Sequence, residues 1–198
     1  MFSFIQCSQP ECEKCRIWNL AYCIDHTPDR EKVTAEILLE LDAKETLTDA
    51  RLEHFLFRET SLSDKEITVC DLSNSTFIGV DFSRTKIKMS FFHFSTFKNC
   101  TFRDSTIKYS VFAGSTFHQC DFRGSDILHS NFIGIEADTC CFNDTDLYYT
   151  NFTSSVLSNT TYIDCNLKKT DFYRSERKNV NYKYSNYEEA FFQRDSAQ

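Results

Sequence analysis

The chain of 198 residues has the size of one domain, or of one domain with a small appendage, and 41% hydrophobic with 26% charged residues is typical of globular proteins. A net charge of −7 argues against direct binding of nucleic acid, because backbone phosphates require a surplus of Lys and Arg. The sequence has 20 Phe and 10 Cys but 4 Gly and 2 Pro, which are too few turn residues for a sheet built from tight hairpins. The chain must therefore turn by some other means.

The start of the chain lacks the features of an export signal. Met1 to Cys7 contain neither a basic segment nor a continuous apolar segment, and no stretch of the sequence has 18 consecutive apolar residues. We therefore expect a cytoplasmic protein with no membrane span. In the reducing cytosol, the cysteines are expected to be free thiols or metal ligands rather than disulfides.

Residues 1–46 differ from the rest of the sequence, and we expect them to form an N-terminal cap. They contain a CxxC pair followed by a CxxH pair, made of Cys12, Cys15, Cys23 and His26. Zinc prefers four tetrahedral sulfur and nitrogen ligands, and this spacing can supply them. We therefore predict a structural zinc site with no open position for water or substrate. Free thiols, or an iron–sulfur site that includes Cys7, are the alternatives.

A helix is predicted directly after this motif. Thr27 can cap it, Pro28 suits its first turn, and Asp29 suits the positive end of the helix dipole. Apolar residues then recur at helical spacing, at Val33, Ile37, Leu38 and Leu41. The pattern predicts a helix over residues 28–44 whose apolar face packs on the segment that follows.

The rest of the chain has a period of five residues. Of the 25 residues at every fifth position from Leu72 to Phe192, 23 are Leu, Ile, Phe or Tyr, and the exceptions are Ala137 and Arg177. The position two residues earlier holds a small Cys, Ser, Thr, Ala or Val in 24 of 25 units, and Ile135 is the exception. Each unit therefore points one large and one small side chain the same way, separated by an outward residue.

A longer period of 20 residues is superimposed on the first. Every fourth large residue is aliphatic, as at Ile67, Ile87, Ile107, Ile127, Leu147 and Leu167. A period of five matches neither a helix nor a long strand, so the chain must bend once in each unit. The longer period indicates that four units complete one turn.

Units such as Cys120-Asp-Phe-Arg-Gly, Ser125-Asp-Ile-Leu-His and Thr170-Asp-Phe-Tyr-Arg resemble the consensus of the pentapeptide-repeat family, Ala-Asp/Asn-Leu-x-x. The resemblance implies an all-β solenoid, a right-handed quadrilateral β-helix with its large side chains stacked along the axis. At 20 residues per turn, residues 47–192 would form about seven coils, with residues 193–198 as a C-terminal tail.

Two features of the repeat concern its interior. Five cysteines occupy the small inward position, namely Cys70, Cys100, Cys120, Cys140 and Cys165, and we interpret them as packing residues. The unit Ile135-Glu-Ala137 exchanges the large and the small residue, which predicts a local bulge or a distorted corner there.

The last units are crowded with aromatic residues: Tyr182, Tyr184, Tyr187, Phe191 and Phe192. These side chains either fold over the end of the solenoid or pack against a second copy. The quinolone-resistance branch of the family dimerises through its C-terminal ends, so the resemblance implies a homodimer through the C-terminal coil.

Function is predicted to reside on the outer surface. No catalytic constellation stands out, and a solenoid filled with Phe offers no central pocket, so we expect no enzyme. Charge is banded: +5 over residues 84–108, −6 over residues 124–167 and +4 over residues 168–187. These bands favour a scaffold that binds an unidentified protein. The alternative, implied by the quinolone-resistance branch, is a DNA mimic that binds a type II topoisomerase such as DNA gyrase, which requires negative charge along most of the rod.

Overall fold

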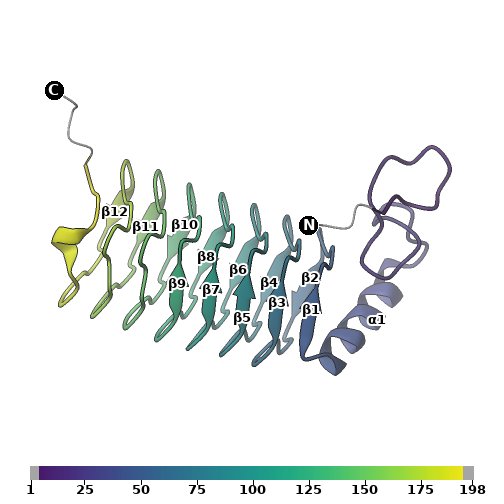
Figure 1. The fold of residues 1–198 in the computed structure, drawn as a ribbon, viewed down its shortest axis with the longest axis horizontal. Helices are drawn as coiled ribbons and strands as arrows, with labels where there is room; N and C mark the ends of the chain where they lie inside the picture. The colour runs from purple at the N-terminus through teal and green to yellow at the C-terminus, as the bar shows by residue number, and fades with distance from the viewer. Residues whose placement is uncertain (1–4, 194–198) are drawn as a thin grey trace.

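The computed structural model describes residues 5–193 and shows a parallel β-solenoid of about seven turns, with one helix near the N-terminus (Figure 1). The coils succeed one another along the long axis, and helix α1 (Arg30–Ala43) lies at the end where the solenoid begins. This confirms the predicted all-β solenoid. Within the described residues, no helix has the length and apolar character that a bilayer span requires.

Two of the four faces are regular parallel sheets. The first face is a sheet of five strands, β1 (Thr46–Thr48), β3 (Glu66–Thr68), β5 (Lys86–Lys88), β7 (Thr106–Lys108) and β9 (Asp126–Leu128). The third face is a sheet of seven strands, β2 (Leu56–Arg58), β4 (Thr76–Ile78), β6 (Thr96–Lys98), β8 (Thr116–His118), β10 (Glu136–Asp138), β11 (Val156–Ser158) and β12 (Glu176–Lys178).

The other two faces are held by single parallel bridges. On the second face, Asp71 pairs with Phe91, Phe91 with Val111 and Val111 with Asn131. On the fourth face, the equivalent series runs through Asp81, Thr101 and Asp121. Every pairing within the solenoid joins residues that are 20 apart, so four five-residue units complete one turn, as the sequence predicts.

The interior is filled by columns of large side chains. Phe92, Phe112 and Phe132 are fully buried, and their ring centroids are 4.9 and 4.7 Å apart along one column. Phe97 stacks between Phe77 and Phe117, at 4.7 Å from each. Flat rings at this separation bury their faces without opening a void, so the repeat period itself produces the close packing.

The small inward residues satisfy the backbone of the preceding turn. The hydroxyl of Ser115 donates to the carbonyl of Phe92 at 2.8 Å, and that of Ser125 donates to Phe102 at 2.6 Å. Cys120 and Cys140 make the same contact through their thiols, at 3.6 Å in both cases. Both are buried, as are the other three inward cysteines. This supports their interpretation as packing residues.

Left-handed residues turn the chain at its corners. Every fifth residue from Asp49 to Tyr184 has a positive φ, and all 4 glycines of the sequence occupy such corners. A non-glycine residue costs about 1–2 kcal/mol in this conformation, and the parallel hydrogen bonds between turns offset that cost. The solenoid therefore needs few Gly and no hairpins.

The exchanged unit does not distort the solenoid, so the predicted bulge is wrong. Ala137 pairs in regular register with Phe117 on one side and Leu157 on the other. Ile135 and Ala137 are both buried, and the corner at Thr139 keeps its ordinary positive φ. The larger side chain of Ile135 offsets the smaller one of Ala137 within the same turn, so the total buried volume and the backbone path stay the same.

Helix α1 begins later than predicted. Its N-cap is Asp29, whose side chain accepts a hydrogen bond from the Lys32 backbone amide at 3.0 Å. Thr27 does not cap the helix, because its hydroxyl donates instead to the Cys23 carbonyl at 2.9 Å. Ile37 and Leu41 are buried in the same apolar core as the first coil, so the helix covers the open end of the solenoid as expected.

At the other end the aromatic residues stack on one another. The 3-10 helix η1 (Tyr187–Glu189) places the Tyr187 ring 4.0 Å from that of Phe192, which in turn stacks on Phe172 at 5.1 Å. Tyr184 and Phe191 remain exposed. The last turn thus closes part of its own edge and leaves an aromatic surface outside it.

Candidate functional site

Four potential metal ligands meet in the segment before helix α1. The ligand atoms of Cys7, Cys12, Cys23 and His26 all lie within 4.8 Å of one another. An antiparallel bridge between Gln6 and Cys15 sets Cys7 at the base of a loop that carries Cys12. Cys23 and His26 belong to one turn, which is closed by a hydrogen bond from the His26 amide to the Cys23 carbonyl at 3.1 Å.

Three separations within this cluster are close to those between the ligands of a tetrahedral metal ion. With Zn–S and Zn–N distances of about 2.3 and 2.0 Å, tetrahedral ligands lie about 3.8 Å apart for two sulfurs and about 3.5 Å apart for sulfur and nitrogen. Here the Cys12 and Cys23 sulfurs are 3.9 Å apart, and His26 Nδ1 lies 3.6 Å from the Cys7 sulfur and 3.3 Å from that of Cys23. The donor set can therefore hold a metal ion.

The structure places Cys7 in the cluster. The CxxC and CxxH spacing predicts Cys15 as the fourth member instead. Neighbouring residues of an extended segment point to opposite sides, and the Gln6–Cys15 bridge puts Cys15 on the same side as Gln6. Cys7 hydrogen-bonds through its amide to the Lys14 carbonyl at 2.9 Å and points to the other side. Cys12, Cys23 and His26 are brought together as predicted, and Cys15 lies outside the group.

Electrostatics in the cluster favour a bound cation. Burial opposes ionisation of the Cys7 thiol, but hydrogen bonds from the backbone amides of Cys23 and Gln9 and from His26 lower its pKa to about 6. The Lys14 backbone amide favours ionisation of Cys12, yet burial and the neighbouring sulfurs of Cys23 and Cys7 raise the pKa of Cys12 above its usual value. One thiolate thus discourages a second, and a cation among the sulfurs would remove that conflict.

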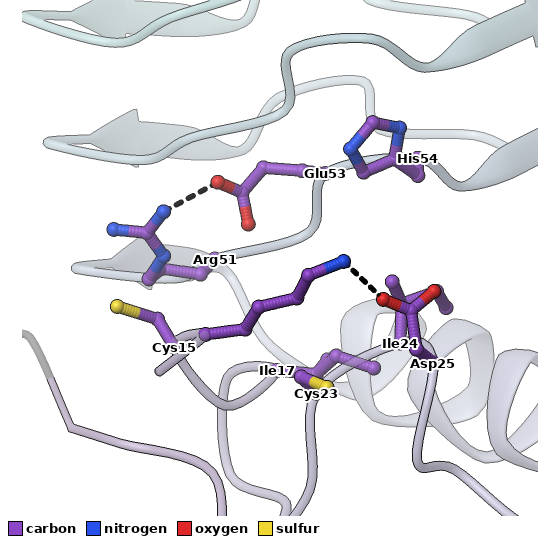
Figure 2. A pocket seen from close by; sticks show the side chains of 9 residues that line it. Cys15, Ile17, Cys23, Ile24, Asp25, Arg51, Glu53 and His54 are labelled. Atoms are coloured by element: carbon purple, nitrogen blue, oxygen red, sulfur yellow. Dashed lines mark hydrogen bonds and ion pairs between the residues drawn. The ribbon is translucent and has the colours of Figure 1, made fainter. Parts of the chain in front are cut away.

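Cys15 faces a cavity of about 480 Å³ between this segment and the first coil, which Cys23 of the cluster also lines (Figure 2). Figure 2 shows its sulfur beside Arg51, away from Cys23. Arg51 forms an ion pair with Glu53, and Lys14 on the opposite wall forms one with Asp25. Both cations that line the cavity therefore already face carboxylates.

The charge bands of the sequence become bands along the rod. Because each turn holds 20 residues and pairs with the next in register, residues 84–108, 124–167 and 168–187 occupy successive stretches of the solenoid axis. A basic stretch of +5 is followed by an acidic stretch of −6 and a second basic stretch of +4. The outer surface is thus divided into regions of opposite sign.

A family model of pentapeptide repeats matches residues 69–104 and 140–176 with 8 copies. These copies lie in the turns whose register and inward columns are described above. The chain belongs to the pentapeptide-repeat family. Residues 105–139, between the two matches, keep the same 20-residue pairing, so this pentapeptide-repeat solenoid is continuous. No curated protein matches the sequence.

Solved structures similar to this pentapeptide-repeat protein share little sequence with it. HetL, a pentapeptide repeat protein involved in heterocyst differentiation regulation in Nostoc sp., is 12% identical, with a TM-score of 0.41 over 83% of this chain and 98% of its own. QnrB1, a plasmid-mediated fluoroquinolone resistance protein, is 14% identical, with a TM-score of 0.38 over 74% and 79%. A thylakoid-lumen protein of Arabidopsis thaliana is 22% identical, with a TM-score of 0.37 over 52% and 64%.

Proposed function

We propose that this pentapeptide-repeat protein is a non-enzymatic scaffold that binds another protein through the faces of its solenoid. The observation that carries the proposal is the filled interior. Columns such as Phe82, Phe102 and Phe122 stack at 4.5 and 4.6 Å and are fully buried, so the inward side chains are used for packing. The outward side chains stand in columns on flat walls, an arrangement suited to an extended contact with a protein surface.

The scaffold proposal predicts a stoichiometric protein complex. Cross-linked full-length protein is recovered from the native host, and the recovered partner is then purified and titrated against this chain by calorimetry. We expect a fixed molar ratio and no chemical turnover. A recovered small-molecule substrate that the protein converts, without a protein partner, would contradict the proposal.

DNA mimicry is the second candidate function, and the acidic stretch over residues 124–167 is what favours it. The basic stretches on either side interrupt the continuous negative charge that a substitute for duplex DNA requires. A supercoiling assay with purified DNA gyrase is the second arm of the same test. The scaffold proposal expects no inhibition at micromolar protein, whereas inhibition would favour the mimic.

We assign a structural zinc ion to the Cys/His cluster. The four donors fill a tetrahedral shell, which leaves no coordination position for a substrate. Its role would be to hold the loops of residues 5–28 together, since this segment buries few apolar side chains, among them Cys7, Ile17 and Cys23. The ion would thus complete the N-terminal cap, which we place at residues 1–46, before the repeat segment of residues 47–192.

The C-terminal coil is proposed to form a homodimer interface. Tyr184 is 72% exposed and Phe191 50% exposed at the end of the rod, which leaves apolar surface available for a second copy. Sedimentation equilibrium is expected to give twice the chain mass of 23.2 kDa. The double substitution Tyr184→Asp and Phe191→Asp should give the monomer mass. A dimer that survives both changes would place the interface elsewhere.

A further inference from the structure

One wall of the solenoid gathers five exposed large apolar side chains. The solenoid's other exposed ones are Leu56 and Val156 on the third face, and Tyr184, Tyr187 and Phe191 near its C-terminal end. Between residues 57 and 155, the large hydrophobic side chains that are exposed are Met89, Phe94, Tyr109, Ile133 and Tyr149. All five lie on the second face or on the two corners that border it. We call the surface made by these five residues and His129 the aromatic wall. The other three faces have no such cluster in this part of the described chain.

The rings of the aromatic wall are held in place by one another. Along one corner, the His129 ring stacks between Tyr109 at 5.3 Å and Tyr149 at 5.2 Å. Tyr149 is covered in the next turn by the Lys169 ammonium, 5.1 Å from its ring centroid. A ladder of this kind loses little side-chain freedom on binding, so contact with it is less costly than contact with mobile side chains.

The opposite corner uses a glycine to lay a ring flat on the surface. Phe94 is 67% exposed, and its ring lies over the next turn at Gly114, where a Cβ atom would come within 2.6 Å of it. His93 packs edge-on against Phe94 at 5.4 Å. Between the two corners, Phe91 and Val111 pair side by side and make the floor of the wall apolar.

Lysines flank the wall at one end. Lys86 on β5 and Lys108 on β7 belong to the neighbouring first face, and Lys98 on β6 belongs to the third. Within residues 5–193, these three form no ion pair with a carboxylate, whereas the nearby Lys88 pairs with Glu66 at 3.4 Å. Toward the other end, Asp126 and Asp146 pair on the first face, at the edge away from the His129 and Tyr149 corner. The surface is therefore apolar, with basic side chains on the neighbouring faces at one end.

We propose that the aromatic wall binds an acidic protein segment that carries large apolar side chains. Its carboxylates lie toward Lys86, Lys98 and Lys108, and its apolar side chains lie on Tyr109 and Phe94. The lysines favour carboxylates, and the net charge of −7 argues against a nucleic acid as the partner. The inference rests on the proposed scaffold function and names the surface and the partner chemistry for it.

A random 12-residue peptide library displayed on phage tests the proposal against the full-length protein. We expect enrichment of peptides that combine Asp or Glu with Trp, Phe or Leu. The enriched peptides are then synthesised, and their affinity for the protein is measured by fluorescence polarisation. The double substitution Phe94→Ala and Tyr109→Ala should weaken binding about tenfold or more, as expected for the loss of two aromatic contacts. Val156→Ala, an exposed apolar change on the third face, should leave it unchanged.

Charge is tested with a matched pair. Lys86→Glu with Lys108→Glu should weaken binding and flatten its salt dependence, whereas Lys178→Glu on β12 should not. The inference would be overturned if the selection enriched basic peptides or no peptides. It would also be overturned if a single-stranded oligonucleotide bound more tightly than the selected peptides, or if the double substitution Phe94→Ala and Tyr109→Ala left peptide binding unchanged. The scaffold function would fail separately, if no protein complex is recovered from the host.

Discussion

Phe97→Ala is expected to lower the free energy of unfolding by about 3–5 kcal/mol. The ring is fully buried and stacks between Phe77 and Phe117, with Phe102 edge-on at 5.7 Å. Its removal leaves a cavity that the neighbouring turns cannot close, because each of them is fixed by hydrogen bonds to the turns on both sides. Guanidinium denaturation followed by circular dichroism measures the loss.

The matched control is Phe94→Ala, three residues earlier. This ring is exposed on the aromatic wall, so its truncation should change the free energy of unfolding by less than about 0.5 kcal/mol. Equal losses for the two variants would contradict the assignment of inward and outward positions. A loss near zero for Phe97→Ala would show that the columns do not stabilise the fold.

The position of the lost ring should also decide how the protein unfolds. Stability in a solenoid is largely a sum over neighbouring turns, so a weak turn in the middle uncouples the two halves. Hydrogen exchange on Phe97→Ala should therefore show faster exchange in the turns next to β6 than at the far end of the third face.

The fold could be predicted from the sequence because a coil with four five-residue sides leaves two periods in the sequence, one of five residues and one of 20. A small inward residue at Ser95 and a large one at Phe97 give the five-residue unit, and the aliphatic column at Ile87 and Ile107 gives the turn. Few other folds require both. The prediction of a bulge at Ile135 was wrong. The repeat period identifies the residue that departs from the pattern, but it does not show whether the backbone of that turn changes.

The members of the Cys/His cluster were harder to predict than the repeat. Spacing along the chain does not show to which side of a paired segment a side chain points. The spacing of Cys12 and Cys15 suits a metal site, but it does not show that both sulfurs point the same way. The signal for Cys7 would have been its pairing across the hairpin, which depends on the Gln6–Cys15 register. The aromatic wall, by contrast, is visible in the sequence once the period is known, because Tyr109, His129 and Tyr149 are spaced by 20.

Cys7→Ser is expected to abolish zinc binding, and Cys15→Ser is expected to retain it. The Cys7 sulfur lies 3.6 Å from His26 Nδ1, within the cluster, whereas Cys15 points into the cavity beside Arg51 (Figure 2). Elemental analysis of freshly purified protein should find about one zinc per chain in the parent and in Cys15→Ser, and a large loss in Cys7→Ser and in Cys23→Ser.

Loss of the metal should loosen the cap and spare the solenoid. Structural zinc contributes about 10–16 kcal/mol of binding free energy in zinc-finger peptides, and the loops before helix α1 have little apolar burial to replace it. Limited proteolysis of Cys7→Ser should therefore cleave within residues 5–28, while the denaturation midpoint of the repeat segment stays near that of the parent. Zinc retained in Cys7→Ser but lost in Cys15→Ser would restore the ligand set read from spacing alone. Metal-free parent protein with an intact cap would show that hydrogen bonds among the thiols and His26 hold these loops without an ion.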